Sequence, residues 1–197
     1  MNSMLVMNSK FDRLAIASVQ AGHRIASVNE PIVDPHKLHI VAFYVQKTED
    51  TKEQLLLHTE DISEVTSRGL IIDHDEQLMS NDGDLVRLQE IIDLDFRLLN
   101  KPVETEGGAK VGSVSRFAID THTFMIMQIY VTQPVTLNFG NAEVIIHRSQ
   151  IINVTEKKII VKDASVKKTA KFSFRNFLFG RQAEPKPEPE RIKIDKN

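Results

Sequence analysis

Short apolar runs separated by turn-forming residues fill the chain from about residue 10 to residue 165. The runs are rich in Ile, Val, Phe and Tyr, and turn formers such as Asp34-Pro35 and Gly107-Gly108 stand between them. This pattern favours strands over helices. The runs at residues 38–45 and 124–131 are apolar at both alternating sets of positions, whereas a half-exposed strand would alternate with polar residues. We therefore predict a mainly β fold in which these two strands are covered on both faces.

The same pattern occurs twice along the chain. Residues 25–45 align without a gap with residues 111–131, and the identical pairs include Ser27/Ser113, Val28/Val114, Asp34/Asp120, His36/His122, Ile40/Ile126, Tyr44/Tyr130 and Val45/Val131. The match resumes with His58/His147 and Val65-Thr66/Val154-Thr155, and before the aligned block Arg13-Leu14 matches Arg97-Leu98. A period near 86 residues is too long for a solenoid repeat. The sequence therefore predicts two similar domains in tandem.

The repeated residues resemble a known domain. Each copy carries a turn, a basic residue with Ile or Val, a small residue before Ser-Val, an Ile- or Val-Asp turn and a strand that ends in Tyr-Val. This pattern resembles the PRC-barrel domain, the small β-barrel of the photosynthetic reaction centre H subunit and of the C-terminal part of the ribosome maturation factor RimM. The first copy departs from it with Ala26 in place of the common glycine, which the second keeps as Gly112. The resemblance implies two PRC-like β-barrels and a non-enzymatic interaction module.

The segment between the copies predicts a helix. Leu85, Leu88 and Ile92 stand at helical spacing, so one apolar stripe can pack against a barrel. The expected organisation is a first PRC-like barrel over residues 1–75, a linking helix within 76–96, a second barrel over 97–165, and a basic Phe-rich segment with a disordered tail over 166–197.

The doubly apolar strands also suggest how the domains are arranged. One face of each strand can fill its own barrel, and the other needs a cover from the sister barrel, the linking helix or another subunit. We predict a shared inter-barrel interface made by Val41, Phe43, Val45, Met127, Ile129 and Val131.

Charge is distributed unevenly along the chain, whose net charge is −2. Residues 157–181 hold eight Lys or Arg and one acid, and residues 182–197 are neutral, so residues 1–156 carry −9. The basic segment can act as an electrostatic handle or simply as a solvated tail. An acidic body is repelled by phosphate, which argues against direct nucleic-acid binding by the barrels.

Two segments are candidate partner-binding sites. The loop at residues 132–143 is apolar where its counterpart in the first copy is polar, and exposed apolar residues often mark a contact surface unless the loop folds back over its own barrel. The basic segment interleaves charges with aromatic rings, which suits an anionic membrane surface, single-stranded nucleic acid or a protein groove. The rings do not share one helical face, which favours a short motif or an extended segment over a membrane-bound helix. The alternative is that these rings pack into the barrels. The candidate partner-binding residues are Val135, Leu137, Phe139, Phe172, Phe174, Arg175, Phe177 and Phe179.

Catalytic chemistry finds little support in the sequence. The absence of cysteine excludes disulfides, thiolate metal sites and cysteine nucleophiles. Asp34 with His36, and Asp120 with His122, form a duplicated pair that could act in acid–base catalysis, but its place at a turn favours capping of backbone N–H groups by the aspartate. We predict no catalytic residue, metal or cofactor.

The sequence therefore predicts a cytoplasmic adaptor or assembly module that binds a protein or a macromolecular assembly, with ribosome maturation one option by resemblance. A peripheral scaffold on an anionic membrane surface, held by the basic tail, is the alternative. An enzyme or small-ligand binder with a site between the barrels is the third hypothesis. The oligomeric state is not predicted.

Overall fold

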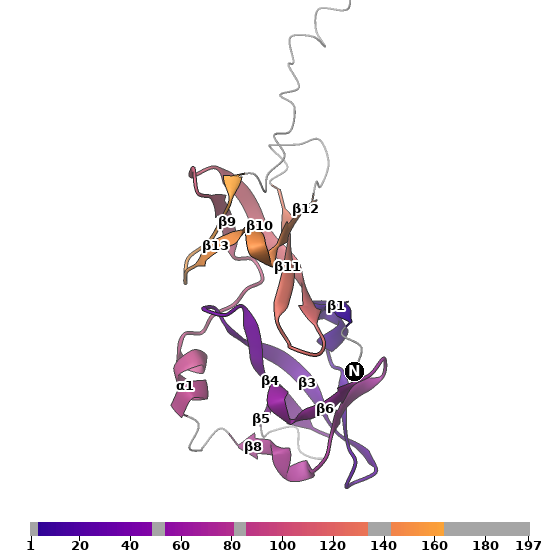
Figure 1. Cartoon of the computed structure of the whole chain (residues 1–197). Helices are drawn as coiled ribbons and strands as arrows, with labels where there is room; N and C mark the ends of the chain where they lie inside the picture. Colours follow the sequence, from indigo (N-terminus) through magenta and orange to yellow (C-terminus); the bar gives the residue numbers. More distant parts are fainter. Residues whose placement is uncertain (1–3, 49–53, 81–85, 134–142, 164–197) are drawn as a thin grey trace, which may run out of the picture. The chain divides into compact units, whose positions relative to one another are not determined.

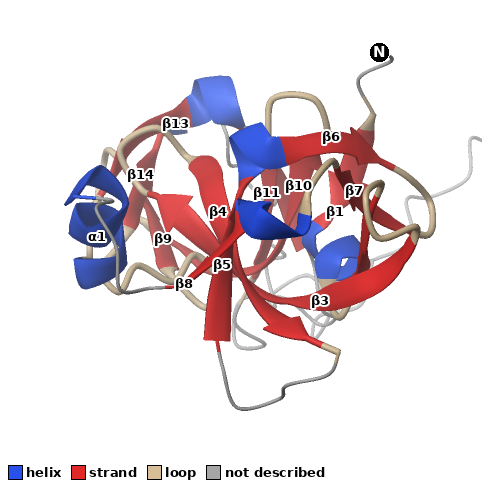
Figure 2. Cartoon of the chain, turned by 90° about the horizontal axis from the view of Figure 1, so that it is seen from below, coloured by secondary structure: helices blue, strands red, loops and turns tan. Residues whose placement is uncertain are grey.

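The computed structural model describes residues 4–48, 54–80, 86–133 and 143–163 (Figure 1). Strands dominate, as Figure 2 shows, and the part of the chain described contains a single α-helix, α1 (Val86–Asp93). The prediction of a mainly β protein is confirmed, and the strands include a curled, barrel-like sheet. Residues 1–166 form one compact unit.

The first repeat forms a seven-stranded sheet in the order β6-β7-β2-β3-β4-β5-β8. Its neighbours are antiparallel except for β2 and β7, which run parallel. The strands are β2 (Ala15–Ser18), β3 (His23–Asp34), β4 (His39–Lys47), β5 (Gln54–His58), β6 (Ile62–Val65), β7 (Gly69–Ile72) and β8 (Leu78–Ser80).

The second repeat forms another sheet in the order β12-β11-β10-β9-β14-β13. The N-terminal strand β1 (Leu5–Met7) joins this second sheet by pairing with β10. The strands are β9 (Pro102–Thr105), β10 (Lys110–Asp120), β11 (Ile126–Thr132), β12 (Glu143–His147), β13 (Ile151–Val154) and β14 (Ile159–Val161). Here β14 and β9 are the parallel pair, as β7 and β2 are in the first sheet.

The two sheets repeat each other down to their irregularities. Val28 pairs with Val45 in the first sheet, and Val114 pairs with Val131 in the second. A β-bulge directly follows Val28 and Val114 in both sheets. Because a one-residue slip would turn every following side chain to the other face, a shared bulge keeps the same positions in the core. The gapless alignment of residues 25–45 with 111–131 is confirmed.

The extension of that alignment towards the N-terminus was wrong. The backbone N–H of Val28 donates to Leu14, and that of Val114 donates to Lys101. The backbone N–H of Leu14 in turn donates to the carbonyl of Phe11 over 3.2 Å, and that of Lys101 donates to the carbonyl of Leu98 over 3.2 Å. Leu98 therefore corresponds to Phe11 and not to Leu14. The identical Arg-Leu dipeptides gave a wrong alignment, because the hydrogen-bonded turn before the strand decides which residues of the two repeats correspond.

An aspartate shapes the turn in the middle of each repeat. Oδ1 of Asp34 accepts hydrogen bonds from the N–H groups of His36 (2.8 Å) and Lys37 (3.4 Å). Oδ1 of Asp120 accepts from the N–H groups of His122 (2.9 Å) and Thr123 (3.0 Å). The prediction that these aspartates cap backbone groups is confirmed, since such turns are typical of Asp.

The residue that ends each turn has left-handed backbone geometry. Leu38 has φ 46° and Phe124 has φ 52°, and both side chains are buried. Non-glycine residues seldom adopt this conformation, so the surrounding contacts must compensate its cost.

The two repeats meet directly after these turns. The N–H of Ile40 donates to the carbonyl of Phe124 over 3.0 Å, and the N–H of Ile126 donates to the carbonyl of Leu38 over 2.9 Å. Ile40 is equivalent to Ile126, and Leu38 to Phe124, so the two hydrogen bonds are equivalent. The starts of β4 and β11 are therefore related by a local two-fold axis. An isologous dimer interface has this same arrangement, here made within one chain.

An aromatic cluster packs beside this junction. The ring centroid of Phe43 lies 5.2 Å from that of Phe11 and 6.0 Å from that of Phe124. Phe43 belongs to the first sheet and Phe124 follows the turn of the second. Most buried apolar residues of the two sheets belong to one hydrophobic core that spans both of them.

The edges of the two long strands are covered differently. On β10, Val6 pairs with Ile119, and Asn8 Oδ1 accepts from the N–H of Phe117 over 3.0 Å. The equivalent of Phe117 on β3 is Pro31, which has no N–H to donate. A segment that approached β3 in the way that β1 and Asn8 approach β10 would therefore lack the hydrogen bond from the backbone N–H at this position.

A helix covers the first repeat instead. Leu88 of α1 is buried against Ile32, Ala42 and Leu56 of the first sheet, and Ile91 and Ile92 pack beside it. The predicted linking helix is thus present over Val86–Asp93, while Leu85 lies outside the described residues.

Candidate functional site

The predicted partner-binding residues lie outside the part of the chain that the structure describes. Val135, Leu137 and Phe139 belong to the segment 134–142 between β11 and β12. Phe172, Phe174, Arg175, Phe177 and Phe179 belong to residues 164–197. Their role therefore stays a prediction.

The six residues predicted at the inter-barrel interface have different positions. Phe43 contacts Phe124 of the other repeat. Val41 packs in the cluster under α1, and Met127 is half-buried. The remaining three are buried in the shared core: Val45, Ile129 and Val131. The backbone hydrogen bonds that join the repeats come from residues outside that set, namely Leu38, Ile40, Phe124 and Ile126.

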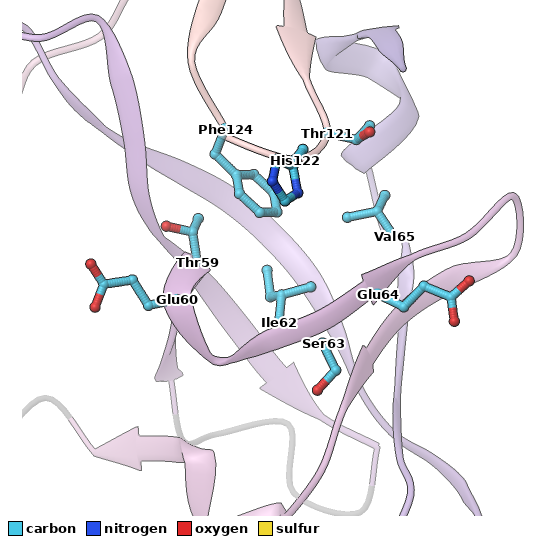
Figure 3. A pocket seen from close by; sticks show the side chains of 9 residues that line it. All are labelled: Thr59, Glu60, Ile62, Ser63, Glu64, Val65, Thr121, His122 and Phe124. Atoms are coloured by element: carbon cyan, nitrogen blue, oxygen red, sulfur yellow. The ribbon is translucent and has the colours of Figure 1, made fainter. Parts of the chain in front are cut away.

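Two grooves lie where the repeats meet, and the duplication relates them to each other. The first groove has a volume of about 450 Å³ and is lined by Thr59, Glu60, Ile62, Ser63, Glu64, Val65, Thr121, His122 and Phe124 (Figure 3). The second groove has a volume of about 300 Å³ and is lined by Pro35, His36, Leu38, Arg148, Ile151, Ile152, Asn153 and Val154. Each residue that lines the second groove has its repeat equivalent in the first. In both, the aspartate turn of one repeat faces the strand after β5 or β12 of the other.

A guanidinium group occupies the second groove. Nη1 of Arg148 donates to the carbonyls of Leu38 (3.0 Å) and Ile126 (3.4 Å), and Nη2 donates to the carbonyl of Lys37. Arg148 thus ties the second repeat to the turn of the first. Charge-assisted bonds from a planar guanidinium are stronger and more directional than neutral ones.

Thr59 holds the equivalent position in the first groove. Its hydroxyl lies 3.1 Å from the carbonyls of both Ile40 and Val41, which belong to its own repeat. The side chain is too short to cross to the other repeat as Arg148 does. Figure 3 shows His122 and Phe124 extending from their turn towards Ile62 and Thr59.

The two grooves also carry opposite charge. Residues 59–73 contain four acids and one arginine, whereas the equivalent residues 148–162 contain four basic residues and one acid. Glu60 and Glu64 flank the first groove in Figure 3, and both are exposed. Ser149 and Asn153 stand at their equivalents in the second repeat. The first groove is therefore acidic and the second basic.

A second difference concerns the outer faces of the sheets. Leu56 is 2% exposed under α1, whereas its equivalent Ile145 on β12 is 54% exposed. Tyr130, the equivalent of Tyr44, is half-buried and its hydroxyl donates to Oε1 of Gln128 over 3.2 Å. Within residues 4–48, 54–80, 86–133 and 143–163, no helix covers this face of the second sheet. We call it the open face, defined by Gln128, Tyr130 and Ile145.

An ion pair borders the open face. The guanidinium carbon of Arg116 lies 4.8 Å from the ring centroid of Tyr130, and Nε of Arg116 donates to Glu143 over 3.0 Å. The hydrogen bond from Arg116 lowers the pKa of Glu143, although partial burial opposes it. On the covered face, burial raises the pKa of Tyr44, and the carboxylates of Glu30 and Asp95 raise it further.

The described residues contain no cluster of three or more His, Cys, Asp or Glu that could hold a metal ion. No helix in that same part of the chain has the length and apolar character needed to cross a membrane. Neither protein-family models nor curated proteins give a match to this chain.

Proposed function

We propose that the protein is a non-enzymatic interaction module made of two PRC-like β-barrels joined by α1, and that it binds a macromolecular partner. The duplicated strand register, the shared core and the resemblance of the repeated residues to the PRC-barrel domain support this architecture. A ribosomal assembly intermediate is one partner that the resemblance suggests. The acidic body favours contact with its proteins over contact with its RNA.

The open face is the observation that carries the proposal. In the first repeat the same face holds α1, which inserts Leu88 between the strands' side chains and packs Ile91 and Ile92 beside it. In the second repeat Ile145 remains 54% exposed at the position equivalent to buried Leu56. An amphipathic helix of the partner, with an apolar stripe like that of α1, is the occupant that this face fits.

The sequence prediction is consistent with this placement. Val135, Leu137 and Phe139 belong to the segment that joins β11 and β12, the two strands that carry Tyr130 and Ile145. A partner on the open face would lie close to the ends of that segment.

Cross-linked affinity purification tests the proposal, with bound proteins identified by mass spectrometry. The full chain is compared with Ile145→Asp on the open face and with Val19→Asp, a matched change at a residue that is 64% exposed in the first repeat. We expect Ile145→Asp to lose a partner that Val19→Asp retains. Circular dichroism spectra equal to that of the unchanged chain ensure that the loss reflects binding and not unfolding.

Two further outcomes decide between the alternatives. If the three proteins capture the same partners, the open face is not the binding site. A chain that ends at Lys168 is tested in parallel, together with sedimentation on anionic vesicles. Salt-sensitive vesicle binding that disappears on truncation would support the peripheral membrane scaffold instead.

A further inference from the structure

We propose that the first groove is a receptor site for an arginine side chain presented by a partner polypeptide. The site is separate from the open face, and the inference does not depend on the function proposed above. It rests on a comparison of the two grooves within this one molecule.

In the second groove, backbone carbonyls of the aspartate turn bind a guanidinium group. The carbonyl of Leu38 accepts from the N–H of Ile126 over 2.9 Å and also from Nη1 of Arg148 over 3.0 Å. The carbonyl of Lys37 accepts from the other guanidinium nitrogen. A carbonyl oxygen has two lone pairs, so the turn serves both its partner strand and a guanidinium.

The first groove repeats the acceptors without the donor. Phe124 is the equivalent of Leu38, has the same left-handed backbone, and accepts from the N–H of Ile40 over 3.0 Å. Its carbonyl and that of Thr123 correspond to two of the three carbonyls that hold Arg148. The third, that of Ile126, corresponds to the carbonyl of Ile40, which accepts from the Thr59 hydroxyl. The hydroxyl of Thr59, which replaces Arg148, bonds to its own repeat. Because the Thr59 side chain is short, it does not reach the position that the guanidinium of Arg148 takes in the second groove.

Charge and volume favour the same ligand. Glu60 and Glu64 flank the groove, and among the described residues its lining contains no Lys or Arg. The volume is about 450 Å³, compared with about 300 Å³ for the groove that contains Arg148. A guanidinium can donate to backbone carbonyls and to a carboxylate at once because its five N–H groups point in different directions. An ammonium group is a point charge and matches this arrangement less well.

The walls suit the rest of an arginine side chain. Ile62, Val65 and Phe124 line the groove, and they offer apolar surface to the methylene groups of the ligand. Glu60, Glu64 and His122 are exposed, so a peptide backbone can approach from solvent. We therefore assign the site to an arginine of another polypeptide, with adjoining residues that are neutral or basic.

The test is a titration of the ¹⁵N-labelled full chain with N-acetyl-arginine amide, followed by amide chemical shifts. We expect saturable shifts confined to residues 59–65 and 121–124, weaker with N-acetyl-lysine amide and reduced by salt. No saturable shift, or equal affinity for the two probes, would overturn the proposal.

Three variants make the test specific. Thr59→Arg places a guanidinium in the groove, as Arg148 does in the other, and should abolish the shifts. Glu60→Gln combined with Glu64→Gln should weaken binding about tenfold, the effect of losing charge-assisted hydrogen bonds. Glu76→Gln removes an exposed carboxylate outside the groove and should change affinity less than twofold. Binding that survives Thr59→Arg, or that the double variant leaves unchanged, would show that the probe lies elsewhere.

The remaining arms identify the source of the arginine. If the probe binds only after Arg175→Gln and Arg181→Gln are introduced, this chain's own basic segment occupies the groove and the assignment to a partner is wrong. If Thr59→Arg converts a dimer to a monomer in light scattering, the arginine comes from a second copy, which also refutes that assignment.

Discussion

Replacement of Phe43 should reveal whether the two repeats fold as one cooperative unit. Its side chain is fully buried, and its ring lies 6.0 Å from Phe124 at an interplanar angle of 74°. Loss of a buried Phe to Ala costs about 3–5 kcal/mol. That could remove most of a domain's stability of about 5–15 kcal/mol, so Leu is the better substitution. We expect Phe43→Leu to cost about 1–1.5 kcal/mol, because it keeps most of the buried volume.

The interaction free energy between the rings of Phe43 and Phe124 tests whether the repeats share a core. An edge-to-face aromatic pair contributes about 0.5–1.5 kcal/mol beyond its buried area. Phe43→Leu and Phe124→Leu together should therefore cost less than the sum of the single changes by about that amount. The left-handed backbone at Phe124 affects Phe and Leu alike, so it cancels in the cycle.

Urea unfolding followed by circular dichroism gives all four free energies of the cycle. A single transition with the same slope is expected for each protein, because one core spans both sheets. Ile159→Val on β14, a strand that pairs with β9 and β13, serves as the control and should be additive with Phe43→Leu. Two separated transitions, or additivity of Phe43→Leu with Phe124→Leu to within about 0.4 kcal/mol, would refute the shared aromatic core.

Two further predictions concern backbone geometry and charge. A Cβ at Gly112, where φ is +152°, would lie 2.1 Å from the carbonyl oxygen of Thr132, so Gly112→Ala should cost at least about 2 kcal/mol. Gly108→Ala also has positive φ, +81°, but open space, and should cost about 1 kcal/mol; equal melting temperatures for the two variants would contradict this reasoning. Because Arg116 lowers the pKa of Glu143 in the folded chain, this carboxylate stabilises the fold above its unfolded pKa and loses that contribution as pH falls through the folded value. Arg116→Ala should therefore be less stable than the unchanged chain at pH 7, with a gap in urea midpoint that narrows below a pH of about 4.5; a gap independent of pH would count against the ion pair.

The features that the sequence predicted correctly depend on neighbours in the chain. The aspartate turns at Asp34 and Asp120 form because each carboxylate reaches N–H groups two and three residues away. The helix at Val86–Asp93 follows from its apolar spacing, and the strands of residues 25–45 and 111–131 follow from their composition. Duplication strengthened the turn and strand predictions, because each of those patterns occurs in both repeats.

The candidate sites could not be predicted in this way. Each groove takes its lining from both repeats, so Thr59 and Phe124 lie together only because the starts of β4 and β11 pair across the junction. Two signals were nevertheless present in the alignment. One is the replacement of Arg148 by Thr59, and the other is the opposite charge of residues 59–73 and 148–162.

The sequence by itself thus determined the local elements and their duplication, since turn chemistry and hydrophobic periodicity act over a few residues. Tertiary structure decided which surfaces became different. Pro31 of β3 has no N–H, so it cannot form the hydrogen bond that Phe117 of β10 donates to Asn8. Leu88 covers the outer face of the first sheet, while Ile145 stays exposed on the outer face of the second. These differences depend on contacts between residues far apart in the chain. Their geometry exists only once the chain has folded.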